Sequence, residues 1–259
     1  MSSNLKKTQY KQKSPKKLYL EFISLVELIR FILDVKSKVS LSKRIYIVKQ
    51  MIVISSKVDC PHTQSEVLSF IKTVLALPRD VKGCIVEAGS YKGGSTAKFS
   101  IAANIANRQL IVFDSFEGIP EDSNPKDKNF YGKSAYFKKG SYKGTIEEVK
   151  KNVSKYGEIS ACRFIKGDFK KTMPKFSKLI ASIYLDVDLA SSTKICLKYL
   201  YPKLNNNGTL FSQDGHIIPV IKVFEDNIFW KEIGCKKPLV ENLGKNKLIK
   251  ITKRLEKKK

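Results

Sequence analysis

The feature that most constrains the fold is a regular alternation, from about residue 80 onward, between short apolar runs and longer stretches of helical pattern. Strand-length apolar runs that are separated by helices predict a mostly parallel sheet with right-handed crossovers and helices on both faces. We therefore expect an α/β fold. The expected strands are CIVEAG (84–89), LIVFD (110–114), CRFIKGD (162–168), ASIYLDVD (181–188), GTLFSQD (208–214) and an edge strand at 247–253, and the expected helices are 94–107, 145–156, 190–204 and 219–230.

The residues before this alternation divide into two parts. Residues 1–17 contain six lysines and no acidic residue, which predicts a basic disordered tail. Residues 18–79 are expected to form a helical extension ahead of the main domain, residues 80–259. Charged residues interrupt the apolar stretch at 18–35, which favours an amphipathic helix over a membrane span or a cleavable signal. We expect this helix to pack on the main domain or on a second subunit of a homo-oligomer.

The chain is strongly basic, with 49 Lys and Arg residues against 24 Asp and Glu residues and a formal charge of +25. Such a charge fits a polyanionic partner, either nucleic acid or an anionic membrane. The lysines are spread along the whole chain, however, and no aromatic RNA-binding motif accompanies them. A general lysine bias is therefore the favoured explanation, and no nucleic-acid partner is expected.

The cysteines indicate the compartment. There are five of them, an odd number, and none belongs to a C-x-x-C pair. This pattern predicts a reducing compartment and no thiolate metal site, so we expect a cytoplasmic protein.

A glycine-rich turn, VEAGSYKGGS (86–95), follows the first expected strand. Gly89, Gly93 and Gly94 let the backbone approach a ligand, and the helix that begins near Ser95 directs free N–H groups toward it. A dinucleotide site needs the spacing G-x-G-x-x-G, whose second glycine makes room for a pyrophosphate. Here Ser90 and Tyr91 occupy that space. The turn therefore predicts a nucleoside-type ligand without a pyrophosphate.

Two acidic residues at strand ends fit the same ligand. Asp114 ends the second expected strand, where an adenosine ribose would present its hydroxyls. Asp168 follows the third strand and could accept a hydrogen bond from an adenine amino group, with Phe169 against the ring. Each aspartate could instead cap a helix or stabilise a turn.

A pair of aspartates near the end of the fourth expected strand suggests a cation. Asp186 and Asp188 are two residues apart, so strand alternation would send both side chains toward one face. Two like charges held this close repel each other unless a cation or a proton lies between them. A magnesium site is the simplest explanation. Alternatively, one aspartate caps the helix that begins near Ala190, a role that Ser191 or Ser192 could also fill.

Four segments together resemble the macrocin O-methyltransferase (TylF) family: VEAGSYKGGS, FDSFEGIP, GDFKKTMP and LDVDLASSTKICLKYLYPKLNNNGTLFSQDG. The resemblance covers about residues 80–230. It implies a Rossmann-like fold and an O-methyltransferase that depends on S-adenosylmethionine (SAM) and a divalent metal, usually magnesium, and acts on sugar hydroxyls. The residues expected to bind SAM are Glu87, Gly89, Ser90, Gly93, Gly94, Ser95, Asp114, Ser115, Asp168 and Phe169.

The resemblance also assigns the metal site, and the chain departs from the family there. It implies that Asp186 is a metal ligand and that Asp188 is the general base. The family usually ends its fifth strand with two acids, whereas this chain has Gln213 and Asp214. A glutamine carbonyl can bind a hard cation but lacks the charge, so weaker metal binding is expected. His216 is either a second candidate base or a structural residue.

Two alternative functions stay open at this point. Gln213 would suit a protein that binds SAM without catalysis, and the net charge would suit an RNA-binding protein or RNA methyltransferase.

The long polar segment 121–144 is expected to form a lid over the acceptor. His62 lies outside the alternation, and no role is predicted for it.

Overall fold

The structure is a computed structural model that describes residues 15–121 and 124–254. Most of the expected basic tail, residues 1–14, lies outside the described residues, and residues 15–17 already belong to the first helix. The helices are α1 (Pro15–Leu33), α2 (Leu41–Lys57), α3 (Gln64–Ala76), α4 (Gly94–Ile105), α5 (Ile146–Tyr156), α6 (Phe169–Thr172), α7 (Ala190–Leu200), α8 (Ile218–Glu225) and α9 (Asn227–Glu232).

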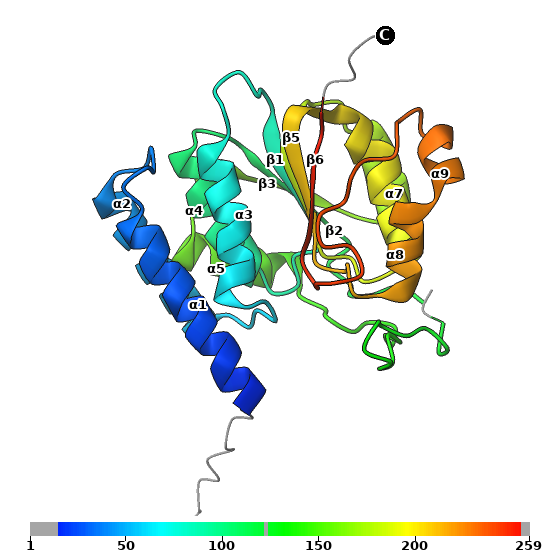
Figure 1. Cartoon of the computed structure of the whole chain (residues 1–259), viewed down its shortest axis with the longest axis horizontal. Coiled ribbons are helices and arrows are strands. Elements are labelled where there is room, and N and C mark those ends of the chain that lie inside the picture. The colour runs from blue at the N-terminus through cyan, green and yellow to red at the C-terminus, as the bar shows by residue number, and fades with distance from the viewer. Residues whose placement is uncertain (1–14, 122–123, 255–259) are drawn as a thin grey trace, which may run out of the picture.

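Six strands form one sheet in the order β3-β2-β1-β4-β5-β6 (Figure 1). The first five strands pair in parallel, and β6 pairs antiparallel with β5 at the edge. The expected mostly parallel sheet and its edge strand are therefore confirmed. The strands are β1 (Cys84–Ala88), β2 (Leu110–Asp114), β3 (Cys162–Lys166), β4 (Ile180–Leu185), β5 (Leu204–Ser212) and β6 (Ile249–Thr252).

Helices cover both faces of this sheet, as the alternation predicts. In β1, Ile85 contributes to a core cluster with α1 to α5, whereas Val86 and Ala88 belong to a second cluster with α7 to α9. Neighbouring residues of a strand point to opposite faces, which is why one short strand serves both cores. Figure 1 shows the two groups of helices on opposite sides of the sheet.

The main differences from the sequence expectation concern two of the expected helices and two of the expected strands. The expected helix 190–204 ends at Leu200, and β5 begins at Leu204, four residues before the expected run. The expected helix 219–230 is two helices, because the Asp226 side chain accepts hydrogen bonds from the backbone N–H groups of the first turn of α9 and so starts a new helix. β4 ends at Leu185, so the two aspartates that were expected at its end lie in the loop beyond it.

The N-terminal helices pack on the main domain. Leu28 and Phe31 of α1 are buried in the first core cluster, and α2 and α3 lie against α4. A capping box between Thr63 and Glu66 fixes the start of α3.

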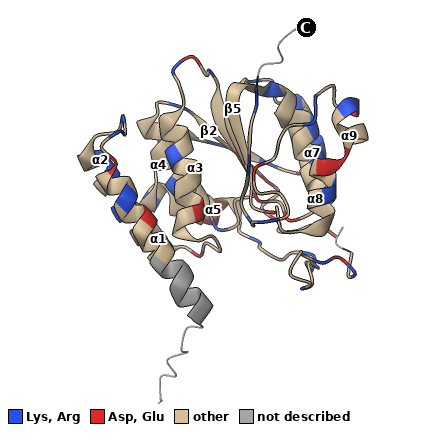
Figure 2. Cartoon of the chain, in the orientation of Figure 1, with Lys and Arg blue, Asp and Glu red and all other residues tan. Residues whose placement is uncertain are grey.

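No helix in the described ranges is both long and apolar enough to cross a membrane. Figure 2 shows Lys and Arg on helices at both sides of the sheet.

The backbones that follow β1 and β4 approach each other closely at Gly89. This residue has φ of +87°, and a Cβ atom at its position would lie 1.9 Å from the carbonyl oxygen of Asp186. Only glycine combines a left-handed conformation with such an approach. The glycine was expected to leave room for a ligand, but the neighbouring backbone uses this space. A bulky residue at this position would therefore distort the sheet before it could report on cofactor binding.

Gly89→Ala should lower the free energy of unfolding by about 3 kcal/mol, because the left-handed φ and the collision with Asp186 both add strain. Gly132→Ala is the matched control, since Gly132 has φ of +76° but no described heavy atom within 4 Å of an added Cβ. It should cost only about 1 to 2 kcal/mol. Urea unfolding of both variants tests the difference, and equal losses would show that the contact at Gly89 is unimportant.

Candidate active site

A cleft of about 1000 Å³ opens at the carboxyl ends of β1 to β4. The sheet order reverses between β1 and β4, and ligands of open α/β sheets bind where the loops separate at such a point. Parts of the expected lid, including Lys139 and Tyr142, line the cleft. The expected site residues that line it are Gly89, Asp114, Ser115, Asp168, Phe169, Asp186 and Asp188.

The other expected site residues of the glycine turn, Glu87, Ser90, Gly93, Gly94 and Ser95, do not line the cleft. Glu87 is fully buried on the α4 side of the sheet, and its Oε1 accepts a hydrogen bond of 2.6 Å from Ser95 Oγ. Burial raises the pKa of Glu87 to about 8. Gly94 packs on the N-terminal extension, since a Cβ atom there would lie 2.7 Å from Cys60 Cβ. Gly93, with φ of +84°, is the N-cap of α4.

Asp114 connects the end of β2 to this turn. Its Oδ2 accepts hydrogen bonds from Ser90 N (2.6 Å) and Ser90 Oγ (2.9 Å), and its Oδ1 accepts one from Phe116 N (2.7 Å). Asp114 therefore does stabilise the turn, as the alternative interpretation expected. Each carboxylate oxygen has two lone pairs, so the side chain keeps acceptor capacity toward the cleft that it lines.

Asp168 also has the alternative role expected for it. Its Oδ1 accepts a hydrogen bond of 2.8 Å from Lys170 N and caps the short helix α6. Phe169 follows it, half-buried against the second core cluster and facing the cleft. The pair thus offers an acceptor and an aromatic ring on the β3 side of the cleft.

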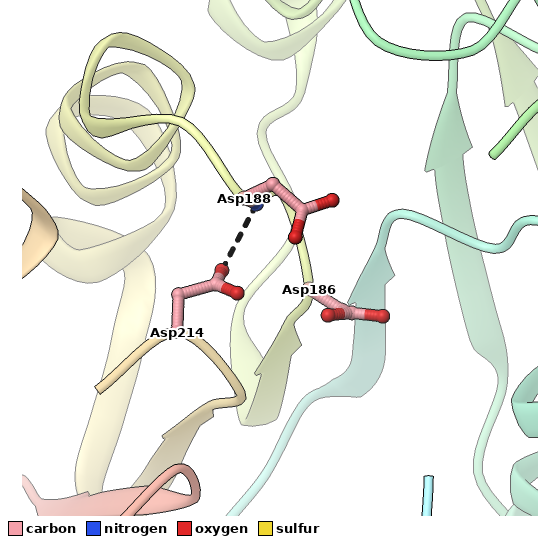
Figure 3. Close-up of side chains that lie close together, drawn as sticks. All are labelled: Asp186, Asp188 and Asp214. Carbon is pink, nitrogen blue, oxygen red and sulfur yellow. Dashed lines mark hydrogen bonds between the residues drawn. The ribbon is translucent and has the colours of Figure 1, made fainter. Parts of the chain in front are cut away.

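Three carboxylates meet on the β4 side, as Figure 3 shows. One oxygen from each of Asp186, Asp188 and Asp214 lies within 4.8 Å of the others. Strand alternation does not produce this arrangement, contrary to the sequence argument, because β4 ends at Leu185. Asp188 is turned back toward Asp186 by a loop in which it has φ of +59°, and Asp214 follows the end of β5.

Hydrogen bonds hold part of this cluster. Asp214 Oδ2 accepts from the backbone N–H groups of Val187 and Asp188, both at 3.1 Å. Asp214 Oδ1 is buried and has no hydrogen-bond partner among the described residues. Burial and the charge of Asp214 raise the pKa of Asp186 and of Asp188, and burial raises that of Asp214. Three close carboxylates with an unpaired oxygen fit a hard divalent cation.

Gln213 and His216 lie near the same strand end but not in the wall of the cleft. Gln213 is fully buried, and neither polar atom of its side chain has a hydrogen-bond partner in the described part of the chain. The His216 ring makes an edge-to-face contact with Phe130, and the His216 carbonyl accepts a hydrogen bond from Phe130 N. Burial lowers the pKa of His216. This placement links His216 to the loop between β2 and α5.

The structure adds one residue that the sequence argument left without a role. His62, from the connection between α2 and α3, has its Nε2 2.9 Å from Asp186 Oδ2. Burial, with the nearby charges of Lys247 and Lys98, lowers the pKa of His62 to about 3, so the contact is a hydrogen bond from a neutral ring. The two residues are 124 positions apart. The capping box that starts at Thr63 was readable as a helix start, but no local signal pointed to Asp186.

Comparisons with known proteins agree with the fold and motifs. The family model described as Macrocin-O-methyltransferase (TylF) matches residues 65–242. A 4'-O-methyltransferase of Streptomyces olivaceus that acts on 8-demethyl-8-(2,3-dimethoxy-alpha-L-rhamnosyl)-tetracenomycin-C is 35% identical over 153 residues, 56% of each chain. The demethyldecarbamoylnovobiocin O-methyltransferase of Streptomyces niveus is 32% identical over 152 residues, 55% of this chain and 56% of the relative. The chain thus spans little more than half the length of these curated relatives.

Solved structures show the same fold. The O-methyltransferase NovP superposes with a TM-score of 0.68 at 20% identity, over 82% of this chain and all of NovP. The calicheamicin methyltransferase CalS11 superposes with a TM-score of 0.57 at 18% identity, over 97% of this chain and 98% of CalS11.

The repulsion within the carboxylate cluster predicts a pH dependence of stability. Because their pKa values are higher in the folded than in the unfolded state, these acids hold protons more tightly when folded. Their contribution to the stability of the folded protein is fully present below the pKa of an aspartate in the unfolded chain. It is lost as the pH rises through the higher pKa values of the folded state. In excess chelator, Asp188→Asn should therefore gain stability relative to the parent, by about 1 kcal/mol or more between pH 4 and pH 8.

Urea unfolding across that pH range measures the difference between the two proteins. Asp80→Asn, at an exposed position away from the cleft, is the control and should keep a constant offset from the parent. Parallel curves for Asp188→Asn and the parent would mean that the three carboxylates do not repel each other appreciably.

Proposed function

Because the chain belongs to the macrocin O-methyltransferase (TylF) family, we propose that it transfers the methyl group of SAM to a hydroxyl of a sugar or of a glycosylated small molecule. The observation that carries this proposal is the cluster of Asp186, Asp188 and Asp214 beside the cleft that Asp114 and Phe169 also line. One cleft thus combines groups suited to a nucleoside with groups suited to a cation.

The β1 to β3 side of the cleft is the proposed SAM site. Asp114 can accept hydrogen bonds from the ribose hydroxyls, and Phe169 offers a ring for the adenine. SAM, when bound, supplies a methyl group activated by its sulfonium charge. Methyl transfer is an in-line displacement, so this part of the chain contributes mainly by alignment of the cofactor with the acceptor oxygen.

The β4 and β5 side is the proposed acceptor and metal site. Asp186 and Asp214 would hold magnesium, with the Gln213 carbonyl as a further candidate ligand. Magnesium, when bound, lowers the pKa of a coordinated hydroxyl. Asp188 lines the cleft and is the proposed base that takes the proton of the acceptor hydroxyl. The buried side-chain amide of Gln213 and the Oδ1 atom of Asp214 have no partner among the residues that the structure describes, which supports this assignment because buried polar atoms normally have one.

The names of the relatives support the substrate class. One curated relative is named for 4'-O-methylation of a rhamnosyl-bearing tetracenomycin, and a solved relative with a TM-score of 0.53 is named a TDP-rhamnose 3'-O-methyltransferase. A sugar hydroxyl is a weak nucleophile at neutral pH, so a site that lowers its pKa and accepts its proton suits such a substrate.

The SAM site is tested by replacement of its aromatic wall. Phe169→Ala should weaken SAM binding about 10-fold, because loss of an aromatic stacking partner typically costs 1 to 3 kcal/mol per base. Phe164→Ala is the matched control: Phe164 is also partly buried but lies outside the cleft. Calorimetric titration with SAM measures both variants. Equal affinity in Phe169→Ala and the parent would exclude an adenine beside Phe169.

The metal and base roles are tested by transfer of labelled methyl from SAM to a mixture of host glycans and small molecules, with magnesium titrated. Asp186→Asn should abolish metal-dependent transfer, and Gln213→Asp should lower the magnesium concentration needed for half-maximal rate, because it adds a charge to the site. Asp188→Asn should reduce the rate by about 100-fold or more, with partial recovery at higher pH, where the acceptor ionises unaided.

The same assay separates the alternative functions. Full activity of the parent in excess chelator would contradict the metal role. SAM binding without turnover on any acceptor would indicate a protein that kept the fold and lost catalysis. Label that enters RNA, with an affinity that falls steeply as salt rises, would indicate an RNA methyltransferase.

A further inference from the structure

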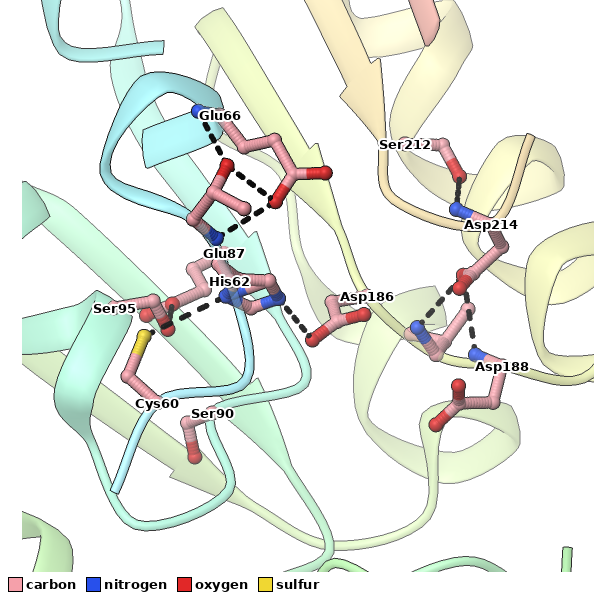
Figure 4. Close-up of polar contacts among 12 residues, drawn as sticks. Cys60, His62, Glu66, Glu87, Ser90, Ser95, Asp186, Asp188, Ser212 and Asp214 are labelled. Atoms are coloured by element: carbon pink, nitrogen blue, oxygen red, sulfur yellow. Dashed lines mark hydrogen bonds and ion pairs between the residues drawn. The ribbon is translucent and has the colours of Figure 1, made fainter. Parts of the chain in front are cut away.

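The side chain of His62, which belongs to the N-terminal extension, reaches the carboxylate cluster. Its Nε2 lies 2.9 Å from Asp186 Oδ2, and only 3% of the His62 side chain is exposed. Figure 4 shows His62 between the start of α3 and Asp186, on the opposite side of Asp186 from Asp188 and Asp214. One oxygen of the proposed metal ligand is therefore engaged by a residue from outside the methyltransferase core.

Several contacts hold the His62 ring in place. Its Nδ1 lies 3.7 Å from Cys60 Sγ, and Cys60 Sγ lies 3.8 Å from the buried Nζ of Lys98 on α4. The ring also packs edge-on against Tyr184 of β4, with centroids 5.9 Å apart. The next residue, Thr63, is the N-cap of α3 and is fixed by its capping box. The ring thus lies between the Cys60 thiol and Tyr184, next to the start of α3.

These contacts favour one tautomer of the His62 ring. Asp186 must be ionised to bind a cation, and an ionised carboxylate only accepts hydrogen bonds, so in that form the 2.9 Å contact requires a hydrogen on Nε2. Nδ1 is then the acceptor, and it faces the Cys60 thiol, which can donate weakly to it. The Cys60 side chain therefore favours the tautomer that the contact with Asp186 needs.

We propose that His62 is a positioning residue for the metal site: its Nε2–H fixes the Asp186 carboxylate so that Oδ1 is presented to the cation. The inference rests on the proposed function, since it takes Asp186 as a metal ligand. Hydrogen-bond partners behind a ligand orient it, and their loss typically costs 10- to 100-fold in metal affinity or activity. The helical extension then completes the site rather than merely packing beside it.

A matched pair of substitutions separates this role from simple packing. In His62→Gln the amide nitrogen can take the place of Nε2, whereas in His62→Asn it stands nearer the position of Nδ1 and falls short of Asp186. Both variants are polar and of similar size. Mn²⁺ is the probe, and its affinity is read from the electron paramagnetic resonance signal of the free ion. Thermal unfolding in chelator confirms that each variant is folded.

The expected result is a Kd for Mn²⁺ within a few-fold of the parent value in His62→Gln and raised about 10- to 100-fold in His62→Asn. The half-saturating magnesium concentration for methyl transfer should rise in the same order, with a smaller change in the rate at saturating magnesium. Cys60→Ala should cause a smaller loss of Mn²⁺ affinity. Cys84→Ala, at a buried free cysteine that lies away from the cluster, should bind as the parent does.

Folded His62→Asn that binds Mn²⁺ as tightly as the parent would overturn the inference and leave the proposed function intact. If His62→Asn does not fold, His62→Phe, which keeps an aromatic ring beside Tyr184 and removes the donor, decides the question by the same criterion. Failure of the parent itself to bind Mn²⁺ would overturn both the metal site and the role of His62. Whether the parent binds Mn²⁺ thus distinguishes an error in the role of His62 from an error in the proposed metal site.

Discussion

The contact between the backbone at Gly89 and the carbonyl oxygen of Asp186 determines where everything else in the site lies. A Cβ atom at Gly89 would lie 1.9 Å from that oxygen, so the two segments can meet only because a glycine follows β1. The contact lies where the sheet order reverses, and the loops after β1 and β4 diverge from it. The cleft opens between those loops, with Gly89 and Asp186 both in its wall.

The carboxylate cluster destabilises the fold, because its like charges repel each other, and hydrogen bonds from several parts of the chain hold it in place. Backbone N–H groups of Val187 and Asp188 bind Asp214, while His62 binds Asp186. One oxygen of Asp214 stays buried and unpaired among the described residues. Buried polar groups in folded proteins normally have partners, and exceptions concentrate at functional sites. A bound cation would stabilise these same groups, because it would offset the repulsion between the carboxylates and give the unpaired oxygen a partner.

The sequence was sufficient for the fold because the fold is encoded in local patterns. The apolar runs and the glycine turn predicted the parallel sheet, its edge strand and the carboxyl-end location of the site, and the motifs predicted the family. The end of β4 was predicted less accurately. The run LDVD was expected to continue the strand, but β4 ends at Leu185 and Asp188 adopts a left-handed φ in the loop beyond it. Glu87 reads as a ligand contact, whereas strand alternation buries it under α4. The contact of His62 with Asp186 was missed, because a contact between residues 124 positions apart leaves no periodic signal.

The central claim is that one cleft holds SAM on its β1 to β3 side and a divalent cation on its β4 side. Anomalous diffraction from crystals grown with Mn²⁺ and S-adenosylhomocysteine, the product of methyl transfer, tests this claim most directly. The account predicts a manganese peak bound by oxygens of Asp186 and Asp214 at about 2 Å, with the nucleoside between Asp114 and Phe169. Manganese elsewhere in the molecule, or a nucleoside outside this cleft, would contradict it.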